Sequence, residues 1–269
     1  GGPRWRRNNG LTATKMLGVN FATQTNKLEL GGSARYNYQD GDIASIGSTE
    51  DFLPNGNSYS NSNSRQRNKA KNFNADFRLE WKPDSMTNII FRPNFSYGKT
   101  DNLSNSENGT FNSDPYSLVT DPNNWLNLEK ILNPDDDPLR SIRINAINSG
   151  SLSDNKSVST DATLQLNRKL NDKGRNVTFR GRFGYTNTDN NQYTESETHY
   201  FKLLNYLQTG DSVLIRNQYI ATPTKNYNYS AQLTYSEPIA RATFLQFSYQ
   251  FQYKYSESDK TTYDLQGFP

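Results

Sequence analysis

The stretch that decides the fold is residues 27–39, which read KLELGGSARYNYQ. From Leu28 to Tyr38 every second residue is apolar, aromatic or small, and the residues between them are mostly polar or charged. A β-strand sends successive side chains to opposite faces, so this alternation gives a strand one apolar and one polar face. A helix would spread the same apolar residues around its axis. The stretch therefore predicts a two-faced β-strand.

The same alternation recurs along the whole chain. It returns at residues 11–22, 73–81, 89–98, 160–170, 177–186, 227–235 and 245–253, with Lys15 interrupting the apolar face of the first of these segments. Strands of this kind need a large apolar residue only at every second position, which reconciles a hydrophobic content of 32% with an aromatic content of 13%. The pattern predicts an all-β, antiparallel protein of about eight strands in one domain, residues 1–269.

The expected connections are of two kinds. Short polar turns are expected at residues 24–26, 82–88, 171–175 and 236–241, and long loops rich in Asn and Ser at about residues 40–71, 99–157 and 187–225. Short turns at one end and long loops at the other are typical of an outer-membrane β-barrel, whose turns are periplasmic and whose loops are extracellular. A tilted strand crosses a bilayer in about 9–11 residues, which matches these segments. We therefore expect an up-and-down transmembrane β-barrel.

Aromatic residues are expected at the two membrane–water interfaces, where amphipathic rings are favoured. Tyr36, Tyr38, Tyr97, Tyr185 and Tyr227 lie beside the expected long loops, and Trp81 and Tyr235 lie beside the expected short turns. Two backbone irregularities are also expected within the strands. Pro93 cannot donate a ladder hydrogen bond and predicts a local bulge, and the pair Gly31 and Gly32 predicts a kink.

Two segments carry a resemblance to a known family. Residues 9–21, NGLTATKMLGVNF, resemble the first barrel strand of TonB-dependent receptor-like outer-membrane proteins of the Bacteroidota type, and residues 76–85, DFRLEWKPDS, resemble a following strand and turn. The resemblance covers the whole chain. It implies that residues 1–9 are the exit from a plug domain and that the strands are the first part of a barrel of about 22 strands. It also implies outer-membrane lipid, the plug, the TonB system and a surface lipoprotein as partners.

Several other classes of protein are disfavoured by composition. The formal charge is +3 without a basic block, so nothing indicates a nucleic-acid partner. There is no cysteine, which excludes disulfides and thiolate metal sites, and no apolar run of 18 residues, as a membrane-spanning helix would need. His199 is the only histidine, so a histidine-based triad is excluded and no enzyme activity is expected. No cofactor is expected either.

The candidate site residues are charges on the polar faces of the strands. A lumen-facing position is expected for Arg35, Arg78, Glu80, Arg92, Arg180 and Arg182. Such residues either contact a plug or ligand or are simply solvated or paired across strands, and the second interpretation is the simpler one. The run Asp135, Asp136 and Asp137 could supply oxygen ligands to Ca²⁺, but it lacks the spacing of an EF-hand loop and is better interpreted as a solvated turn. Residues 125–132 before it are expected to form a short helix.

The sequence therefore predicts an outer-membrane receptor or transporter barrel for TonB-dependent uptake of an unidentified ligand, located in the bacterial outer membrane. Two alternatives remain open. One is a small, non-transporting barrel with a structural or adhesive role, whose interior would be filled by side chains if eight strands closed alone. The other is a soluble extracellular β-module that binds glycans.

Overall fold

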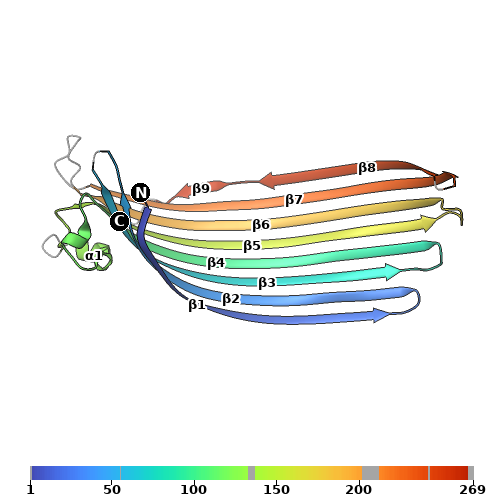
Figure 1. Cartoon of the computed structure of the whole chain (residues 1–269), viewed down its shortest axis with the longest axis horizontal. Coiled ribbons are helices and arrows are strands. Elements are labelled where there is room, and N and C mark those ends of the chain that lie inside the picture. Colours follow the sequence, from blue (N-terminus) through green and yellow to red (C-terminus); the bar gives the residue numbers. More distant parts are fainter. Residues whose placement is uncertain (1, 55, 133–136, 202–211, 242, 266–269) are drawn as a thin grey trace.

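The computed structural model describes residues 2–54, 56–132, 137–201, 212–241 and 243–265, which form one antiparallel sheet (Figure 1). Each strand pairs with the next one along the chain, so the predicted up-and-down topology is confirmed. The strands are β1 (Gly2–Gln24), β2 (Leu28–Asp51), β3 (Ser58–Trp81), β4 (Thr87–Phe111), β5 (Arg143–Lys169), β6 (Asn176–Tyr200), β7 (Ser212–Ala240), β8 (Thr243–Ser258) and β9 (Thr261–Asp264). Within the described residues, three short helices lie between β4 and β5: η1 (Pro115–Ser117), η2 (Pro122–Trp125) and α1 (Leu128–Ile131).

The sheet is open. Within the described residues β1 pairs only with β2 and β8 only with β7, so these two strands are its edges. The four predicted short turns lie at one end of the sheet, and the helices lie at the other (Figure 1). No helix of the described part of the chain is long and apolar enough to cross a membrane.

The strands are much longer than the sequence predicts. β1–β7 contain 23 to 29 residues each, so the long loops expected at residues 40–71, 99–157 and 187–225 are wrong. At the end of the sheet opposite the predicted short turns, the strands are connected only by residues 52–57, 112–142 and 201–211. Residues 2–9, expected as a plug exit, are part of β1 and pair with β2, while Gly1 lies outside the described residues. These Asn- and Ser-rich stretches carry no apolar alternation, yet their backbones complete the ladder with their neighbours.

An apolar band crosses one face of the sheet at the end near the short turns. Its members lie in register from strand to strand, as where Leu30 pairs with Leu79, Leu79 with Phe91 and Phe91 with Leu164. The band comprises Leu17, Val19 and Phe21; Leu28, Leu30, Ala34 and Tyr36; Phe73, Phe77, Leu79 and Trp81; Ile89, Phe91, Phe95 and Tyr97; Ala162, Leu164 and Leu166; Val177, Phe179, Phe183 and Tyr185; Tyr227, Tyr229, Leu233 and Tyr235; and Phe247, Tyr249, Phe251 and Tyr253.

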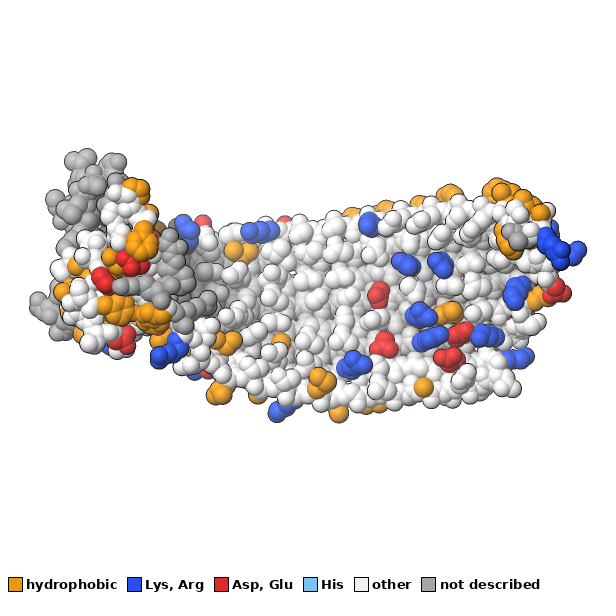
Figure 2. Space-filling model, viewed as in Figure 1, with side chains coloured by type: hydrophobic (Ala, Val, Ile, Leu, Met, Phe, Trp, Pro, Cys, Tyr) orange, Lys and Arg blue, Asp and Glu red, His pale blue; other side chains and the backbone are white. Residues whose placement is uncertain are grey.

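Much of this band is uncovered. Phe183 is 46% exposed, Leu233 49% and Tyr249 71%. Rings from neighbouring strands contact one another instead of a second layer, with centroids 5.3 Å apart for Tyr185 and Tyr227 and 5.0 Å apart for Tyr229 and Tyr253. The other face carries charged side chains and few apolar ones over the same half of the sheet (Figure 2). A continuous apolar face of this size marks a surface that meets something other than water.

The two internal prolines disturb the ladder only locally. Pro93 keeps its pairing with Ala162 of β5, but toward β3 the ladder lacks pairs for Phe77 and Arg78. The register is the same on both sides of this gap, so the predicted bulge at Pro93 is wrong: a missing N–H removes bonds on one side without inserting a residue. Pro223 of β7 acts in the same way. β8 and β9 both pair with the same edge of β7, and the gap between them lies beside Pro223. In this gap the Asp259 N–H still donates to the Pro223 carbonyl at 3.2 Å.

The segment at residues 112–142, which we call the cap, has a small core of its own. Its N-cap side chains are Asp114, Asp121 and Asn127, each accepting a backbone N–H at the start of a short helix. α1 confirms the expected helix, although only over Leu128–Ile131. The buried apolar residues that join the cap to β4, β5 and the end of β6 are Phe111, Leu126, Leu128, Ile131, Leu139, Ala146 and Phe201. The cap is therefore docked on the sheet by apolar contacts.

Gly32 provides space for an aromatic contact rather than a kink. The register runs unbroken through Gly31 and Gly32 on both sides of β2. The Phe21 ring lies over Gly32 and reaches toward Phe77, with ring centroids 6.2 Å apart. A Cβ atom at position 32 would lie 2.7 Å from the Phe21 ring and 2.9 Å from the Asp76 carbonyl, whereas at position 31 its nearest neighbour is 3.7 Å away.

We predict that Gly32→Ala destabilises the fold by about 1–3 kcal/mol, because the added methyl group has no room. The matched control, Gly31→Ala, is expected to be neutral or slightly stabilising, since glycine costs conformational entropy in a strand. The measurement is urea unfolding in detergent micelles followed by tryptophan fluorescence. Equal stability of the two variants would contradict this account of Gly32.

Candidate functional site

Three of the predicted lumen residues meet in one pocket on the polar face. Arg92 of β4 and Arg182 of β6 both pair in register with Thr163 of β5, and Arg180 of β6 pairs with Gln165. The pocket, which we call the arginine pocket, has a volume of about 320 Å³. Its remaining lining residues are Ile90, Leu164 and Gly181.

The three guanidinium groups of this pocket are not neutralised by the protein. Among the described residues, none of the side chains of Arg92, Arg180 and Arg182 makes a hydrogen bond or an ion pair. Asp161 lies on the same face two residues along β5, and within the described chain it has no ion pair with them. Positive charges held this close repel one another, and guanidinium groups bind carboxylates and phosphates in a bidentate manner. The arrangement favours an anionic group in the pocket.

The other predicted lumen residues lie on the same face but do not join the pocket. Arg78 makes an ion pair with Glu80 at 2.9 Å, and Lys82 reaches the same carboxylate at 3.2 Å. Arg35 lies opposite Asn74. These charges fit the simpler interpretation of solvated or paired groups. That the polar face lines a lumen stays a prediction at this point.

The predicted interface aromatics fall into two sets. Trp81 and Tyr235 lie close to the short turns, as expected, at the last rows of the band. Tyr36 and Tyr97 both pair with Phe73, and Tyr185 pairs with Tyr227, at the opposite limit of the band. Tyr38 lies one row further. This second set is not at strand ends, because the strands continue well past it.

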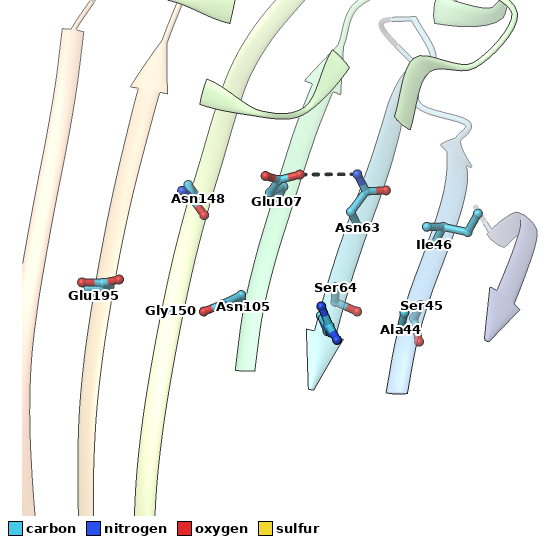
Figure 3. Close-up of a pocket in the computed structure, with 11 residues that line it drawn as sticks. Ala44, Ser45, Ile46, Asn63, Ser64, Asn105, Glu107, Asn148, Gly150 and Glu195 are labelled. Atoms are coloured by element: carbon cyan, nitrogen blue, oxygen red, sulfur yellow. Dashed lines mark hydrogen bonds between the residues drawn. The ribbon is translucent and has the colours of Figure 1, made fainter. Parts of the chain in front are cut away.

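A second, larger pocket lies beyond the band on the same face, toward the cap (Figure 3). We call it the amide pocket. It has a volume of about 540 Å³ and is lined by Ala44, Ser45, Ile46, Asn63, Ser64, Arg65, Asn105, Glu107, Asn148, Gly150 and Glu195. The Asn63 amide donates to Glu107 at 3.4 Å (Figure 3), and Asn127 of the cap donates to the same carboxylate at 3.4 Å. Amides and carboxylates side by side can bind polar ligands by hydrogen bonds.

One cap residue fixes the position of this pocket. The Asn123 amide donates to the Ser62 carbonyl at 2.9 Å, and its carbonyl accepts from Asn61 at 2.9 Å. Asn63 also donates to the Asn123 backbone carbonyl at 2.8 Å. The sequence did not reveal the amide pocket, because its residues lie within segments expected to be loops. An Asn-rich stretch has no signal that separates a paired strand from a loop.

Arg65 at the edge of the amide pocket makes a bidentate pair with Asp42, with N–O distances of 3.0 and 2.6 Å. These hydrogen bonds hold the pKa of the Asp42 carboxyl below its ordinary value, and partial desolvation opposes the effect. Arg67 lowers the pKa of Asp40 by the same means. Because the charged form is favoured in the fold, each pair stabilises it above a pH of about 3.9 and ceases to do so as the pH falls through the lowered pKa.

We predict that Arg65→Gln raises the pKa of Asp42 back toward its ordinary value, because its principal hydrogen-bond donor is lost. Asp40 is the internal control and keeps its lowered pKa, since Arg67 is unchanged. Carboxyl ¹³C chemical shifts followed over a pH titration measure both groups. An unchanged Asp42 titration would show that the pair does not form in solution.

Asp137 is not a solvated turn residue. Its carboxylate accepts from the Arg143 guanidinium at 2.9 and 3.0 Å, and both side chains are fully buried. Arg143 also donates to the Trp125 carbonyl at 2.8 Å and lies over the Phe111 ring. Asp135 and Asp136 lie outside the described residues. Within the described part of the chain no group of three His, Cys, Asp or Glu residues could hold a metal ion.

His199, the single histidine, also has a structural setting. It lies one residue before the end of β6, bonds to Glu197 at 2.5 Å and stacks near Phe201. It is buried, next to the core that joins the cap to the sheet. That it has no catalytic role stays a prediction.

We predict that Asp137→Asn opens the cap, at a cost of about 3–5 kcal/mol, because Arg143 keeps a buried charge without its counter-ion. Native-state proteolysis within residues 112–142 reports the free energy of this opening. Asp42→Asn is the matched control, since its pair with Arg65 is exposed, and it should leave cleavage of the cap unchanged. Equal protease resistance of Asp137→Asn and the wild type would show that this ion pair does not hold the cap on the sheet.

Comparison with known proteins finds only weak similarities to solved structures. No protein-family model matches the chain, and no curated protein matches it. Among solved structures, the RagAB peptide transporter has 11% identity and a TM-score of 0.35, over 95% of this chain and 37% of the other. The siderophore receptor PiuA from Acinetobacter baumannii has 8% identity and a TM-score of 0.24, over 97% and 47%. OccK10 (OpdN) from Pseudomonas aeruginosa has 8% identity and a TM-score of 0.13, over 99% of each chain.

The chain thus spans less than half the length of the peptide transporter and of the siderophore receptor. TM-scores this low carry no argument about function. The function is argued below from this chain's own residues.

Proposed function

We propose that the chain forms part of the wall of an outer-membrane β-barrel that acts as a receptor or transporter. The apolar band faces lipid, and the polar face with the arginine pocket faces the lumen. The observation that carries the proposal is the band itself: an exposed apolar face that stays in register across eight strands and ends, on the cap side, within two cross-strand rows of the same level in all of them.

The height of the band fits a bilayer. In β2 it extends from Leu28 to Tyr36, and in β6 from Val177 to Tyr185, which is nine residues in each case. A tilted strand needs about 9–11 residues to cross the hydrocarbon core. Aromatic rings are concentrated at both limits, as favoured at membrane–water interfaces. The short turns then lie on the periplasmic side, and the cap and the extended strands lie on the extracellular side.

The open edges and the lumen charges favour a large barrel. In lipid every backbone N–H and C=O must be paired, so the free edges of β1 and β8 require partner strands. A barrel closed by eight strands has its interior filled by side chains. The unpaired Arg92, Arg180 and Arg182 do not suit such an interior, since buried charges without counter-ions are costly. A wider, wet lumen or the surface of a plug accommodates them.

Uptake driven by the TonB system, with a plug and a surface lipoprotein as partners, is the part of the proposal that rests on the family resemblance of residues 9–21 and 76–85. The arginine pocket supports this part of the proposal. A barrel wall that contacts a plug or a passing ligand needs polar groups that are not already hydrogen-bonded within the wall. Carboxylate or phosphate groups are the partners that three unpaired arginines would bind.

The chain has no cysteine, so single-cysteine variants test the two faces directly. We predict that Arg180→Cys reacts with a membrane-impermeant maleimide in outer-membrane vesicles, while Phe179→Cys does not, because lipid covers it. The two positions are adjacent in β6, which makes each the control for the other. Arg182→Cys and Phe183→Cys repeat the comparison one row further.

Equal labelling of both positions in vesicles would contradict a membrane location. Purification of the folded chain without detergent, with both positions reactive, would favour the soluble module. Protection of both Phe179→Cys and Arg180→Cys would exclude a wet lumen at this height. The interior would then be filled, either by side chains of a small barrel or by a plug.

A further inference from the structure

Four lysines lie in one row just beyond the band. Lys15 of β1 pairs with Tyr38 of β2, Tyr38 with Lys71 of β3, Lys71 with Lys99 of β4, and Lys99 with Lys156 of β5. Each lysine is two residues from a member or neighbour of the band, so it lies on the same face. We call this set the lysine row. It marks the height at which the apolar surface ends on the cap side.

This row is electrostatically unfavourable by itself. Side chains directly opposite in neighbouring strands lie about 4.5–5.5 Å apart at Cβ, and like charges there are destabilising. Lys99 is the one member with acidic partners, Asp101 at 3.5 Å and Asp154 at 3.4 Å. Among the described residues Lys15, Lys71 and Lys156 have no ion pair. Three ammonium groups therefore remain available to an external anion.

The neighbouring acids do not cancel this charge. Asp101 and Asp154 are engaged with Lys99, and Asp40 in the next row is paired with Arg67. Asp189 of β6 continues the row directly opposite Lys156, but among the described residues the two side chains form no ion pair. Lys69 lies opposite Asp40 and Asp101 and adds a further positive charge to that row. Lys71 and Lys156 are exposed on either side of the Lys99 cluster.

We propose that the lysine row binds the phosphate groups of anionic lipid headgroups in the leaflet on the cap side. This inference rests on the proposed membrane location. The row adjoins the band through Phe73, Tyr97 and Val158, so one molecule can lay its acyl chains on the band and its headgroup at the lysines. Lysine is a common phosphate ligand as a point charge, and basic residues near an anionic leaflet add to membrane affinity individually.

The test uses the full chain in vesicles of phosphatidylcholine with a minor fraction of phosphatidylglycerol. Native mass spectrometry of the extracted protein measures the retained lipid. The double variant Lys71→Gln and Lys156→Gln is expected to lose its preference for phosphatidylglycerol by on the order of tenfold. Lys71→Arg with Lys156→Arg is expected to keep it. The matched control, Lys173→Gln with Lys254→Gln, removes the same charge from a short turn and from the polar face of β8, and should change nothing.

An unchanged lipid preference in the glutamine double variant would overturn the inference while leaving the proposed function intact. Competition by free inorganic phosphate as effective as that by the lipid would identify a soluble-anion site and overturn it as well. Failure of the wild-type chain to enter vesicles would overturn both, and the cysteine labelling would then show both faces of β6 reactive.

Discussion

The pairing register of the strands is the constraint on which the rest of the structure depends. Side chains alternate with a period of two residues, so a slip of one residue in any strand would send its apolar residues to the polar face. The register shifts in the described pairings lie at Pro3 and Trp5, at Thr110 and Phe111, and at Pro238 and Ala240, all outside the band. Within the band the ladder holds one register per pair. The alternation in each strand thereby becomes one continuous apolar surface.

The same register groups the charges that the proposals use. Arg92, Arg180 and Arg182 are separated along the chain, and strands β4 to β6 bring them together around Thr163. On the opposite face Lys71, Lys99 and Lys156 become neighbours by the same pairing. The lysines are direct cross-strand partners, and like charges are destabilising at that spacing. The arginines lie further apart, around Thr163, and among the described residues their side chains have no acidic partner. Both are therefore places where an external partner is expected, one on the polar face and one at the cap-side limit of the apolar band.

The part of the sheet beyond the band is held differently. It lacks an apolar face, and the cap stabilises it through Asn123, whose amide bonds to β3, and through the apolar residues that surround Arg143. The buried Asp137–Arg143 pair ties the end of the cap to the start of β5. An ion pair of this kind contributes little net stability, but removing one partner is costly. The cap thus has a defined position over the amide pocket.

The sequence by itself determined the strand type, the two faces and the short turns, because a period-two pattern and turn residues are local properties. It also placed all six lumen candidates on one face of the sheet. It missed the length of the strands, since a polar strand is held by pairing with a neighbour and residues such as Asn63 and Asn105 look the same in a loop. It also misjudged Asp137, because burial depends on what folds over a residue. Only the tertiary structure decided which charges meet, since cross-strand distance is set by register and is invisible along the chain.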